Sequence, residues 1–459
     1  MVKIFDSKHG ERQLKADVDT KPIKTPALMT TQVTPADSDV LIPAHHLSSR
    51  LIIAGTVGNI MEWYDFAVYA YFAETIGQHF FPSNDPTTSL IATFGVFAVG
   101  FLMRPLGGAL FGHIGDKVGR KAALTISVLA MAIPTFLIGI LPDHTTLGPV
   151  AAIVLVILRM IQGLSVGGEY TTSIVFLVEG SGRQHRGFAG SWSGFGAVGG
   201  ILLGSAVGVL VNLCFSAEAV RDWAWRLPFI LGLLVGLAGL YVRRHIPESH
   251  QPKRQKAERS PVLEAMRSER RTICNIALMN VINGVGFYIA FVYLVTYMQK
   301  IGGLSEVVAL EINTVNMIAL LAMYPLSGWL SDRIGRKPLL IAGISGLLVL
   351  SWPLFWALHH PSVAWNFAGQ FGFAVLMGLF GGVLPVTMVE ITPRALRCSV
   401  ISISYNLCVG LLGGTAPLVA TWLIAETHDD LAPAYYIMVA ALISLAVVVQ
   451  LPETLNTDA

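Results

Sequence analysis

The 459-residue chain contains 53% hydrophobic and only 13% charged residues, whereas soluble globular proteins carry about 25% charged residues. Because the apolar residues fall in many long runs, the composition excludes a soluble multidomain protein and indicates an integral membrane protein. The 31 Lys and Arg residues against 29 Asp and Glu leave a net charge of +2, which excludes an overall attraction to nucleic acid. The four cysteines show no CxxC spacing, so neither a disulfide framework nor a zinc site is predicted.

The N-terminal residues 1–50 lack the apolar core of a signal peptide and are predicted to form a disordered cytoplasmic tail. After them, stretches of about 20 apolar residues, the length that crosses a bilayer, give twelve candidate spans. In chain order the spans cover 51–73, 88–111, 122–141, 148–178, 187–213, 225–242, 272–298, 307–330, 338–358, 364–390, 398–424 and 432–450. The predicted domains are a six-helix bundle at 51–242, a basic cytoplasmic linker at 243–271, a second six-helix bundle at 272–451 and a cytoplasmic tail at 452–459.

The loops carry their basic residues almost entirely on one side of the membrane. Nineteen Lys and Arg residues lie in the linker and in the loops after spans 2, 4, 8 and 10, whereas the opposite loops hold Arg221, Arg226 and Lys300. By the positive-inside rule, both termini and the linker are cytoplasmic. We therefore expect a monomeric, multi-pass protein of the cytoplasmic (inner) membrane, whose partners are the lipid bilayer, protons and a small-molecule substrate.

Span 1 carries two acids near the middle of the bilayer. Asn59, Glu62, Asp65 and Tyr69 are spaced so that they share an arc of roughly 120° on a helix. Glu62 and Asp65 lie about 16 to 21 Å from the cytoplasmic end by helical rise. Because two acids one turn apart in a low dielectric disfavour simultaneous ionisation, at least one of them is expected to carry a proton. The alternative is a structural pair that an arginine of a neighbouring helix neutralises.

Arg104 in span 2 and Arg159 in span 4 are also predicted to lie inside the membrane. A charge at a span centre costs about 2.5 to 3.5 kcal/mol on insertion scales, so each of these residues is a functional candidate. Because a guanidinium stays charged and matches a carboxylate bidentately, they are either substrate ligands or counter-ions of the buried acids. For Arg159 pairing is the favoured interpretation, because Glu169 shares its helix face.

The C-terminal half offers uncharged polar side chains in place of buried charges. Most of them are expected to form hydrogen bonds between helices, and some could complete a cavity at the interface between the halves. They are Asn280, Asn283, Tyr288 and Tyr293 in span 7, Asn313 and Asn316 in span 8, and Ser404, Tyr405 and Asn406 in span 11.

Three motifs recur in the two halves, in the same order and each just past the corresponding span. GHIGDKVGRK at 112–121 returns as GWLSDRIGRK at 328–337, the Glu-x3-Arg-x2-Arg element at 179–186 returns at 390–397, and PES at 247–249 returns as PET at 452–454. This duplication predicts two similar six-helix bundles.

The repeated loops combine glycines with charges of both signs. The glycines permit a tight turn, the acids Asp116 and Asp332 can cap a helix N-terminus or hold an arginine, and the basic pair faces anionic headgroups. We expect a charge cluster that locks the cytoplasmic side closed and breaks when that side opens; the alternative is a static turn. The candidate gate residues are Asp116, Arg120, Glu179, Arg183, Asp332, Arg336, Glu390 and Arg394.

The GxxxDxxGRK loops and the twelve spans in two repeats resemble the major facilitator superfamily. Four strings are similar to its metabolite:proton symporters: GNIMEWYDFAVY at 58–69, FLMRPLGG at 101–108, RMIQGLSVGGEYTTS at 159–173 and DWAWRLPF at 222–229. That family includes α-ketoglutarate permease, citrate:proton symporters and the proline/betaine porter, so the resemblance implies proton-coupled uptake and leaves the substrate open. APAYYIMVAAL at 432–442 leans toward the proline/betaine porter, although the chain ends at Ala459, without that porter's C-terminal coiled coil.

Two strings imitate motifs of soluble enzymes. GFGAVG at 194–199 matches GxGxxG, but it lies in an apolar span, so Gly196 and Gly200 are interpreted as a small-xxx-small helix contact. GLSVG at 163–167 matches GxSxG, yet no His lies at a span centre to serve Ser165 as a base. The sequence also lacks a P-loop. We therefore expect neither an enzyme nor an ATP-driven pump, and no cofactor.

These observations predict an all-α membrane protein with twelve transmembrane helices in two pseudo-symmetric six-helix bundles, the major facilitator fold. The predicted function is proton-coupled secondary active uptake of a small carboxylate-bearing metabolite, such as a di- or tricarboxylate, by alternating access. The alternatives are a symporter of zwitterionic osmolytes such as proline or betaine, an uncoupled facilitator or exporter, and a non-transporting sensor. The expected proton-coupling residues are Glu62, Asp65 and Glu169, and the expected substrate ligands are Arg104, Arg159, Tyr69 and Gln162.

Overall fold

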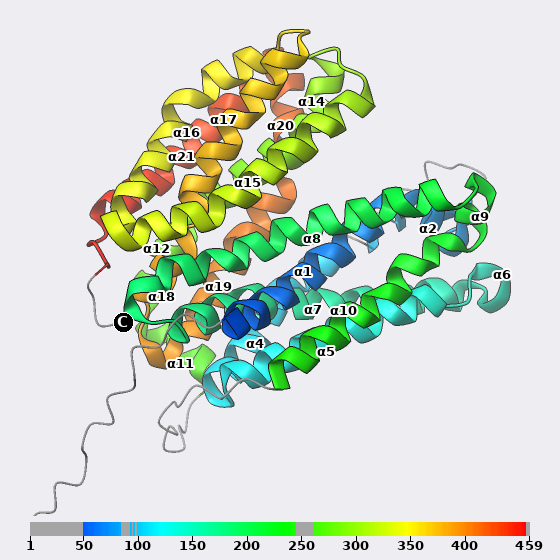
Figure 1. The fold of residues 1–459 in the computed structure, drawn as a ribbon, viewed down its shortest axis with the longest axis horizontal. Coiled ribbons are helices and arrows are strands. Elements are labelled where there is room, and N and C mark those ends of the chain that lie inside the picture. The colour runs from blue at the N-terminus through cyan, green and yellow to red at the C-terminus, as the bar shows by residue number, and fades with distance from the viewer. Residues whose placement is uncertain (1–48, 84–91, 94, 97–98, 245–259, 456–459) are drawn as a thin grey trace, which may run out of the picture. The chain divides into compact units, whose positions relative to one another are not determined.

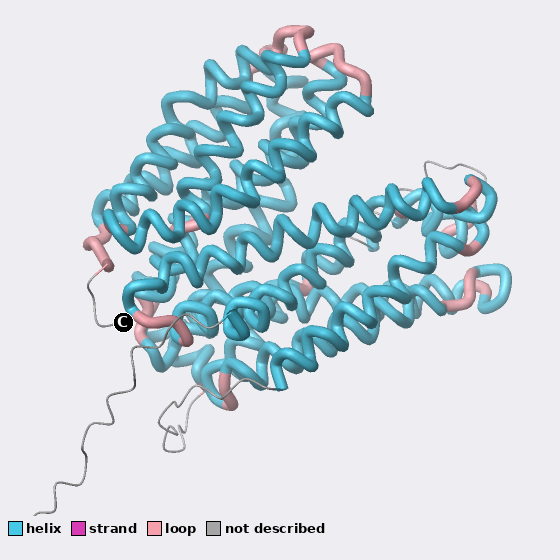
Figure 2. Tube along the Cα trace, in the orientation of Figure 1, coloured by secondary structure: helices cyan, strands magenta, loops and turns pink. Residues whose placement is uncertain are grey.

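A computed structural model describes residues 49–83, 92–93, 95–96, 99–244 and 260–455. They belong to one compact unit, and within these ranges the chain is helical with short loops and no strand (Figure 2). The predicted N-terminal tail up to residue 48, part of span 2, most of the linker and the last four residues lie outside the described residues.

The described part of the N-terminal half contains five helices of 18 to 31 residues and four shorter ones (Figure 1). The helices are α1 (Ser49–Tyr71), α2 (Ala73–Phe80), α4 (Arg104–Lys117), α5 (Arg120–Ile140), α6 (His144–Leu147), α7 (Pro149–Glu179), α8 (Arg186–Cys214), α9 (Ala217–Asp222) and α10 (Leu227–Arg244). Two 3-10 turns precede α8 and α10 at Arg183–His185 and Ala224–Arg226.

The C-terminal half repeats the pattern with more interrupted helices. It comprises α11 (Pro261–Ser268), α12 (Arg270–Met279), α13 (Val281–Tyr288), α14 (Leu294–Lys300), α15 (Glu306–Ile334), α16 (Arg336–Leu358), α17 (Val363–Gly381), α18 (Leu384–Glu390), α19 (Arg397–Cys408), α20 (Gly414–Thr427) and α21 (Ala432–Gln450). A π-helical turn at Ile289–Tyr293 joins α13 to α14, a second one at Val409–Gly413 joins α19 to α20, and a 3-10 turn at Arg394–Leu396 precedes α19.

Ten helical stretches among the described residues are long and apolar enough to cross a membrane. The α1 helix is not one of the ten, because buried polar residues such as Asn59, Glu62 and Asp65 lower its mean hydropathy. With α1 and the partly described second span, the helices account for the twelve predicted spans.

Glycines let the helices that carry the buried charges approach closely. On α8, a Cβ at Gly196 or Gly200 would collide with the main chain of α1, which confirms the predicted small-xxx-small contact. On α7, a Cβ at Gly163 or Gly167 would meet the main chain of residues 100–108. The Arg104 side chain therefore starts directly beside α7.

Helices from opposite halves also pack against one another. The α8 helix lies along α15, and α4 lies along α19. These two pairs are equivalent in the internal repeat. They carry the loop acids Asp116 and Asp332, and α8 and α19 begin at Arg186 and Arg397, the last arginines of the Glu-x3-Arg-x2-Arg elements.

Candidate functional site

Asp65 lies at the centre of a polar network that joins α1, α5 and α7. Its carboxylate accepts hydrogen bonds from Arg159 Nη1 at 2.6 Å, Gln162 Nε2 at 2.8 Å and Thr135 Oγ1 at 2.8 Å. The Asp65 and Arg159 side chains are completely buried, so each charge depends on the other for compensation. An arginine of a neighbouring helix therefore neutralises one acid of span 1, as the alternative interpretation expects. The sequence favours pairing of Arg159 with Glu169, but its ion pair in the described residues is with Asp65.

Further contacts hold the rest of this network in place. The Arg159 guanidinium carbon lies 4.2 Å from the centre of the Tyr69 ring, and the Tyr69 hydroxyl donates to the Thr93 carbonyl at 3.2 Å. Gln162 also donates to Thr135 and accepts from Arg159. Three of the four expected substrate ligands, Arg159, Gln162 and Tyr69, are thus engaged within the N-terminal bundle, and their role as ligands stays a prediction.

Glu62 lies one helical turn from Asp65 but in a different environment. Its side chain is 1% exposed, and both carboxylate oxygens are buried without a hydrogen-bond partner among the described residues. Arg104 and Glu169 are the charges that act on it most strongly. Since an unpaired buried carboxylate is costly, Glu62 is poised to receive a proton or a cationic group.

Arg104 is buried to the same extent and is only partly engaged. Its Nε donates to Asn406 Oδ1 of α19 at 3.5 Å, whereas Nη2 has no hydrogen-bond partner within the described part of the chain. Asn406 in turn donates to the Gly167 carbonyl of α7 at 2.6 Å. Arg104 and Glu62 thus provide opposite charges that lie near one another and, in the residues that the structure covers, form no ion pair.

Aromatic side chains from both halves surround these two charges. Tyr170 of α7, Tyr288 of α13 and Tyr405 of α19 all lie within electrostatic reach of Glu62 and Arg104. The rings of Tyr170 and Tyr405 are 4.9 Å apart between centres. Together these groups can bind the cationic end of a small molecule by a carboxylate and aromatic faces, and its anionic end by a guanidinium.

Glu169, the third expected proton-coupling residue, lies on α7 with 2% exposure. Its carboxylate is hydrogen-bonded to the Ser127 hydroxyl of α5. The Ser165 hydroxyl of the GxSxG string donates to the Ser127 carbonyl at 2.6 Å, and the whole string lies inside α7. Ser165 therefore occupies a helix and not the strand-to-helix turn that a nucleophile elbow requires.

At the predicted cytoplasmic end, Asp116 caps a helix of the other half. Its two oxygens accept from the backbone N–H groups of Cys398 at 3.1 Å and Ser399 at 2.8 Å, the second and third residues of α19. Burial raises the pKa of the Asp116 carboxyl above its ordinary value, while Arg120 and the Ser399 and Cys398 donors act in the opposite direction.

Glu179 connects the two halves beside that cap. Its carboxylate binds Arg120 Nε at 3.2 Å within the N-terminal half and Arg397 Nη1 at 2.9 Å in the C-terminal half. Arg120 also donates to the Arg394 carbonyl at 3.0 Å. The first repeat of the loop motif is therefore an inter-half cluster and not only a turn.

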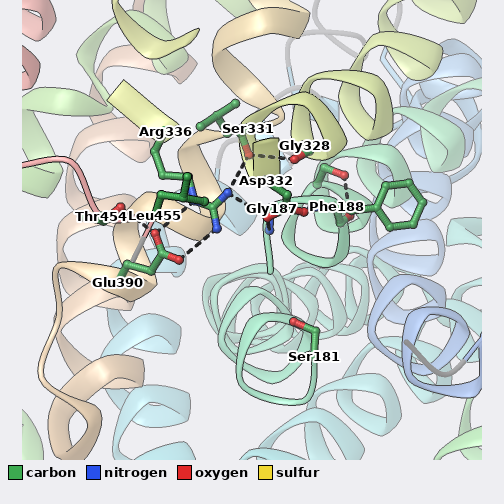
Figure 3. Close-up of polar contacts among 12 residues, drawn as sticks. Ser181, Gly187, Phe188, Gly328, Ser331, Asp332, Arg336, Glu390, Thr454 and Leu455 are labelled. Carbon is green, nitrogen blue, oxygen red and sulfur yellow. Dashed lines mark hydrogen bonds and ion pairs between the residues drawn. The ribbon is translucent and has the colours of Figure 1, made fainter. Parts of the chain in front are cut away.

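The second repeat forms the equivalent cluster (Figure 3). Asp332 accepts from the N–H groups of Gly187 and Phe188, each at 2.8 Å, and so caps α8. Arg336 binds Asp332 at 2.8 Å and Glu390 at 3.1 Å. The acids of both loops thus cap a helix of the opposite half and hold an arginine, which are the two roles expected for them.

Six of the eight candidate gate residues lie together in these two clusters through their side chains. They are Asp116, Arg120, Glu179, Asp332, Arg336 and Glu390. Arg394 takes part through its carbonyl, and Arg183 lies in the 3-10 turn before α8. Arg397 is absent from the predicted gate, although it is the last arginine of the repeated Glu-x3-Arg-x2-Arg element and makes an ion pair with Glu179 of the other half.

The uncharged polar residues of the C-terminal half divide into two groups. Asn316 donates to Gln370 at 3.2 Å, an interhelical bond of the expected kind between α15 and α17. Asn406, Tyr405 and Tyr288 instead lie beside Arg104. Sequence reasoning names these three residues without placing them at the site, because nothing in their own spans distinguishes them from structural residues.

Comparison with known proteins places this geometry in a wider group. The family model described as Major Facilitator Superfamily matches residues 55–417 and 276–454. A proline/betaine transporter of Salmonella typhimurium is 36% identical over 420 residues, which cover 89% of this chain and 84% of the relative. A glycine betaine/proline/ectoine/pipecolic acid transporter of Dickeya dadantii is 37% identical over 421 residues, with coverage of 89% and 84%.

A solved structure has the same fold at lower sequence identity. The proton:xylose symporter bound to 6-bromo-6-deoxy-D-glucose has a TM-score of 0.72 and 19% identity, over 88% of this chain and 96% of that chain. At that level of identity the likeness concerns the arrangement of the helices.

Proposed function

This chain belongs to the major facilitator superfamily, and from that membership we propose that it takes up a small zwitterionic osmolyte of the proline and betaine type in symport with protons. The observation that carries the proposal is the buried pair of opposite charges, Glu62 and Arg104, which lie close together without an ion pair in the described residues. A zwitterion supplies the complementary charge to each.

The charge balance favours an osmolyte over the di- or tricarboxylate that the sequence alone favours. Arg159 is already neutralised by Asp65, whereas Arg104 forms no ion pair in the described residues and has Glu62 as a nearby negative charge. A dicarboxylate would place a second anion beside Glu62, and a buried charge without a partner costs several kcal/mol. The substrates in the names of the relatives at 36% and 37% identity point the same way.

We place proton exchange at Asp65. Protonation of its carboxyl would remove the negative charge that Arg159 faces at 2.6 Å and would loosen the contacts among α1, α5 and α7. Glu62, one turn away, would then face the cationic nitrogen of the substrate, and Glu169 remains a second candidate for a proton. The sequence expectation assigns proton coupling to both acids of span 1, whereas this proposal keeps that role for Asp65 and makes Glu62 a substrate ligand.

The clusters at the predicted cytoplasmic end would act as the gate. The Asp116 and Asp332 caps and the Glu179–Arg397 ion pair join the halves, so they must break for the substrate to leave on that side. The described conformation corresponds to a closed cytoplasmic side in this scheme.

Uptake into proteoliposomes tests the proposal. The purified protein is given labelled proline, glycine betaine, α-ketoglutarate or citrate, with and without an inwardly directed proton gradient. We expect accumulation of proline or glycine betaine that requires the gradient. Uptake that ignores the gradient would identify a facilitator, accumulation of the organic acids alone would refute the substrate class, and no transport of any compound would favour a sensor.

A further inference from the structure

The hydroxyl of Tyr288 is a buried donor that the mechanism above does not use. Its polar neighbour is the Arg104 guanidinium, which can only donate to it, so the hydroxyl proton has no acceptor among the described residues, although buried tyrosine hydroxyls usually find one. Tyr288 is the last residue of α13, directly before the π-helical turn at Ile289–Tyr293, and π-helical turns are frequent at functional sites.

The neighbours of Tyr288 fix its ring in position. A Cβ at Gly413 would lie 2.7 Å from the ring, so the main chain of the second π-helical turn is in close contact with it. The Phe287 ring packs against it at 5.6 Å between centres, in an edge-to-face arrangement. The hydroxyl is consequently held beside the Arg104 guanidinium of the other half.

The two groups together form a pair of donors without an acceptor. The Nε edge of Arg104 is directed to Asn406, and Nη2 has no partner in the described residues. A guanidinium offers no acceptor, so even a bond from Arg104 to the Tyr288 oxygen would leave the hydroxyl proton unused. Two adjacent donors, one of them charged, match the two oxygens of a carboxylate.

We propose that Tyr288 is the ligand by which the C-terminal bundle holds the substrate carboxylate, jointly with Arg104 of the N-terminal bundle. This inference rests on the proposed function and adds a residue and an atom to it. Because the two ligands belong to different halves, a bound carboxylate bridges them at the centre of the molecule. A hydrogen bond to a charged group contributes enough free energy that its loss should weaken binding about tenfold to a hundredfold.

Tyr288→Phe removes the hydroxyl and keeps the ring, and Tyr297→Phe is the matched control. Tyr297 lies on the same span, is 1% exposed and also has a hydroxyl without a partner in the described residues, but its charged neighbours are Asp429 and Asp430. Affinities of the full chain in lipid nanodiscs are measured for glycine betaine and for betaine amide, which replaces the carboxylate with a neutral group. Thermal unfolding of each variant checks that it is folded.

We expect Tyr288→Phe to lower the affinity for glycine betaine at least tenfold and to leave the affinity for betaine amide within twofold of the wild type. Tyr297→Phe should change neither affinity. Equal losses for both compounds would assign Tyr288 a purely structural role, and no loss for glycine betaine would exclude it as a ligand. If betaine amide binds too weakly to measure, the contrast between the two variants on glycine betaine decides. A wild-type protein that binds neither proline nor glycine betaine would overturn the proposed function itself, a result distinct from failure of Tyr288 alone.

Discussion

Replacing Asp65 with asparagine separates the charge of this residue from its hydrogen bonds. In Asp65→Asn the amide oxygen can still accept from Gln162 and Thr135, whose bonds to Asp65 are both 2.8 Å long. The variant loses the negative charge that faces Arg159 at 2.6 Å. Since both side chains are completely buried, Arg159 is left as an uncompensated charge, and breaking such a pair costs about 3 to 5 kcal/mol.

The expected result has a thermodynamic and a functional part. Asp65→Asn should lower thermal stability, and adding Arg159→Gln should restore much of it, because the double variant buries no unpaired charge. A permanently neutral residue at position 65 cannot exchange a proton, so gradient-driven accumulation of the osmolyte should disappear. Counterflow of labelled against unlabelled osmolyte should persist, because it needs no net proton movement.

Accumulation and counterflow are measured on the same proteoliposome preparation. Thr135→Val is the control, because it removes one hydrogen bond to Asp65 and no charge. Accumulation that survives in Asp65→Asn at the level of the control would refute proton exchange at Asp65. Stability losses that simply add in the double variant would refute the idea that Arg159 depends on Asp65 for its charge compensation.

Three further predictions concern other contacts. Glu62→Gln should lower the affinity for glycine betaine at least tenfold in a binding assay, because the ammonium group of the substrate loses its anionic partner. Unchanged affinity would contradict this placement of the substrate. Glu179→Gln should weaken the inter-half contact with Arg397 by about 1 kcal/mol, given its partial exposure, and so increase labelling of cysteines introduced behind the gate from the cytoplasmic side. The exposed Glu306→Gln is the control, and equal labelling of both variants would argue against the gate. The Thr145 hydrogen bond and then His79 lower the pKa of Asp143 to about 2, so its ionised form stabilises the fold above pH 4, and this contribution is lost as the pH falls toward 2. Asp143→Asn should therefore lower the melting temperature at pH 7 but not at pH 2, and a constant difference would be the contrary result.

The number of spans and most residues of the two charge clusters between the halves could be predicted from the sequence because both depend on local information. A span is a run of apolar residues of fixed length, and the acids of the loop motifs recur with the glycines that shape the turn. That the motif acids cap a helix could also be predicted, since an acid near a helix start tends to bind its free N–H groups. Which helix Asp116 caps did not follow, because α19 lies about 280 residues further along the chain.

The partners of the buried charges depended on packing that no local pattern encodes. Glu169 shares a helix face with Arg159, yet α7 also packs against α1, and Arg159 pairs with Asp65 of that helix. Asp65 and Glu62 are neighbours on one helix face, but Asp65 is bonded to α5 and α7, whereas the charges nearest Glu62 are Arg104 of α4 and Glu169 of α7. Helical periodicity could identify the acids and could not separate their environments. The same holds for Tyr288, whose significance depends on a guanidinium in the other half of the chain.

The α4–α19 pair connects the site to the gate. The α4 helix carries Arg104 at its start and Asp116 near its end, which a helical rise of 1.5 Å per residue separates by about 18 Å. The α19 helix carries the capped N–H groups of Cys398 and Ser399 at its start and Asn406, the partner of Arg104, two turns later. Because helices move largely as rigid bodies, a rotation that withdraws Asp116 from α19 also changes the Arg104–Asn406 contact. If the two clusters act as the proposed gate, its opening would also alter the Arg104 guanidinium, and a substrate bound there would need no separate signal for its release.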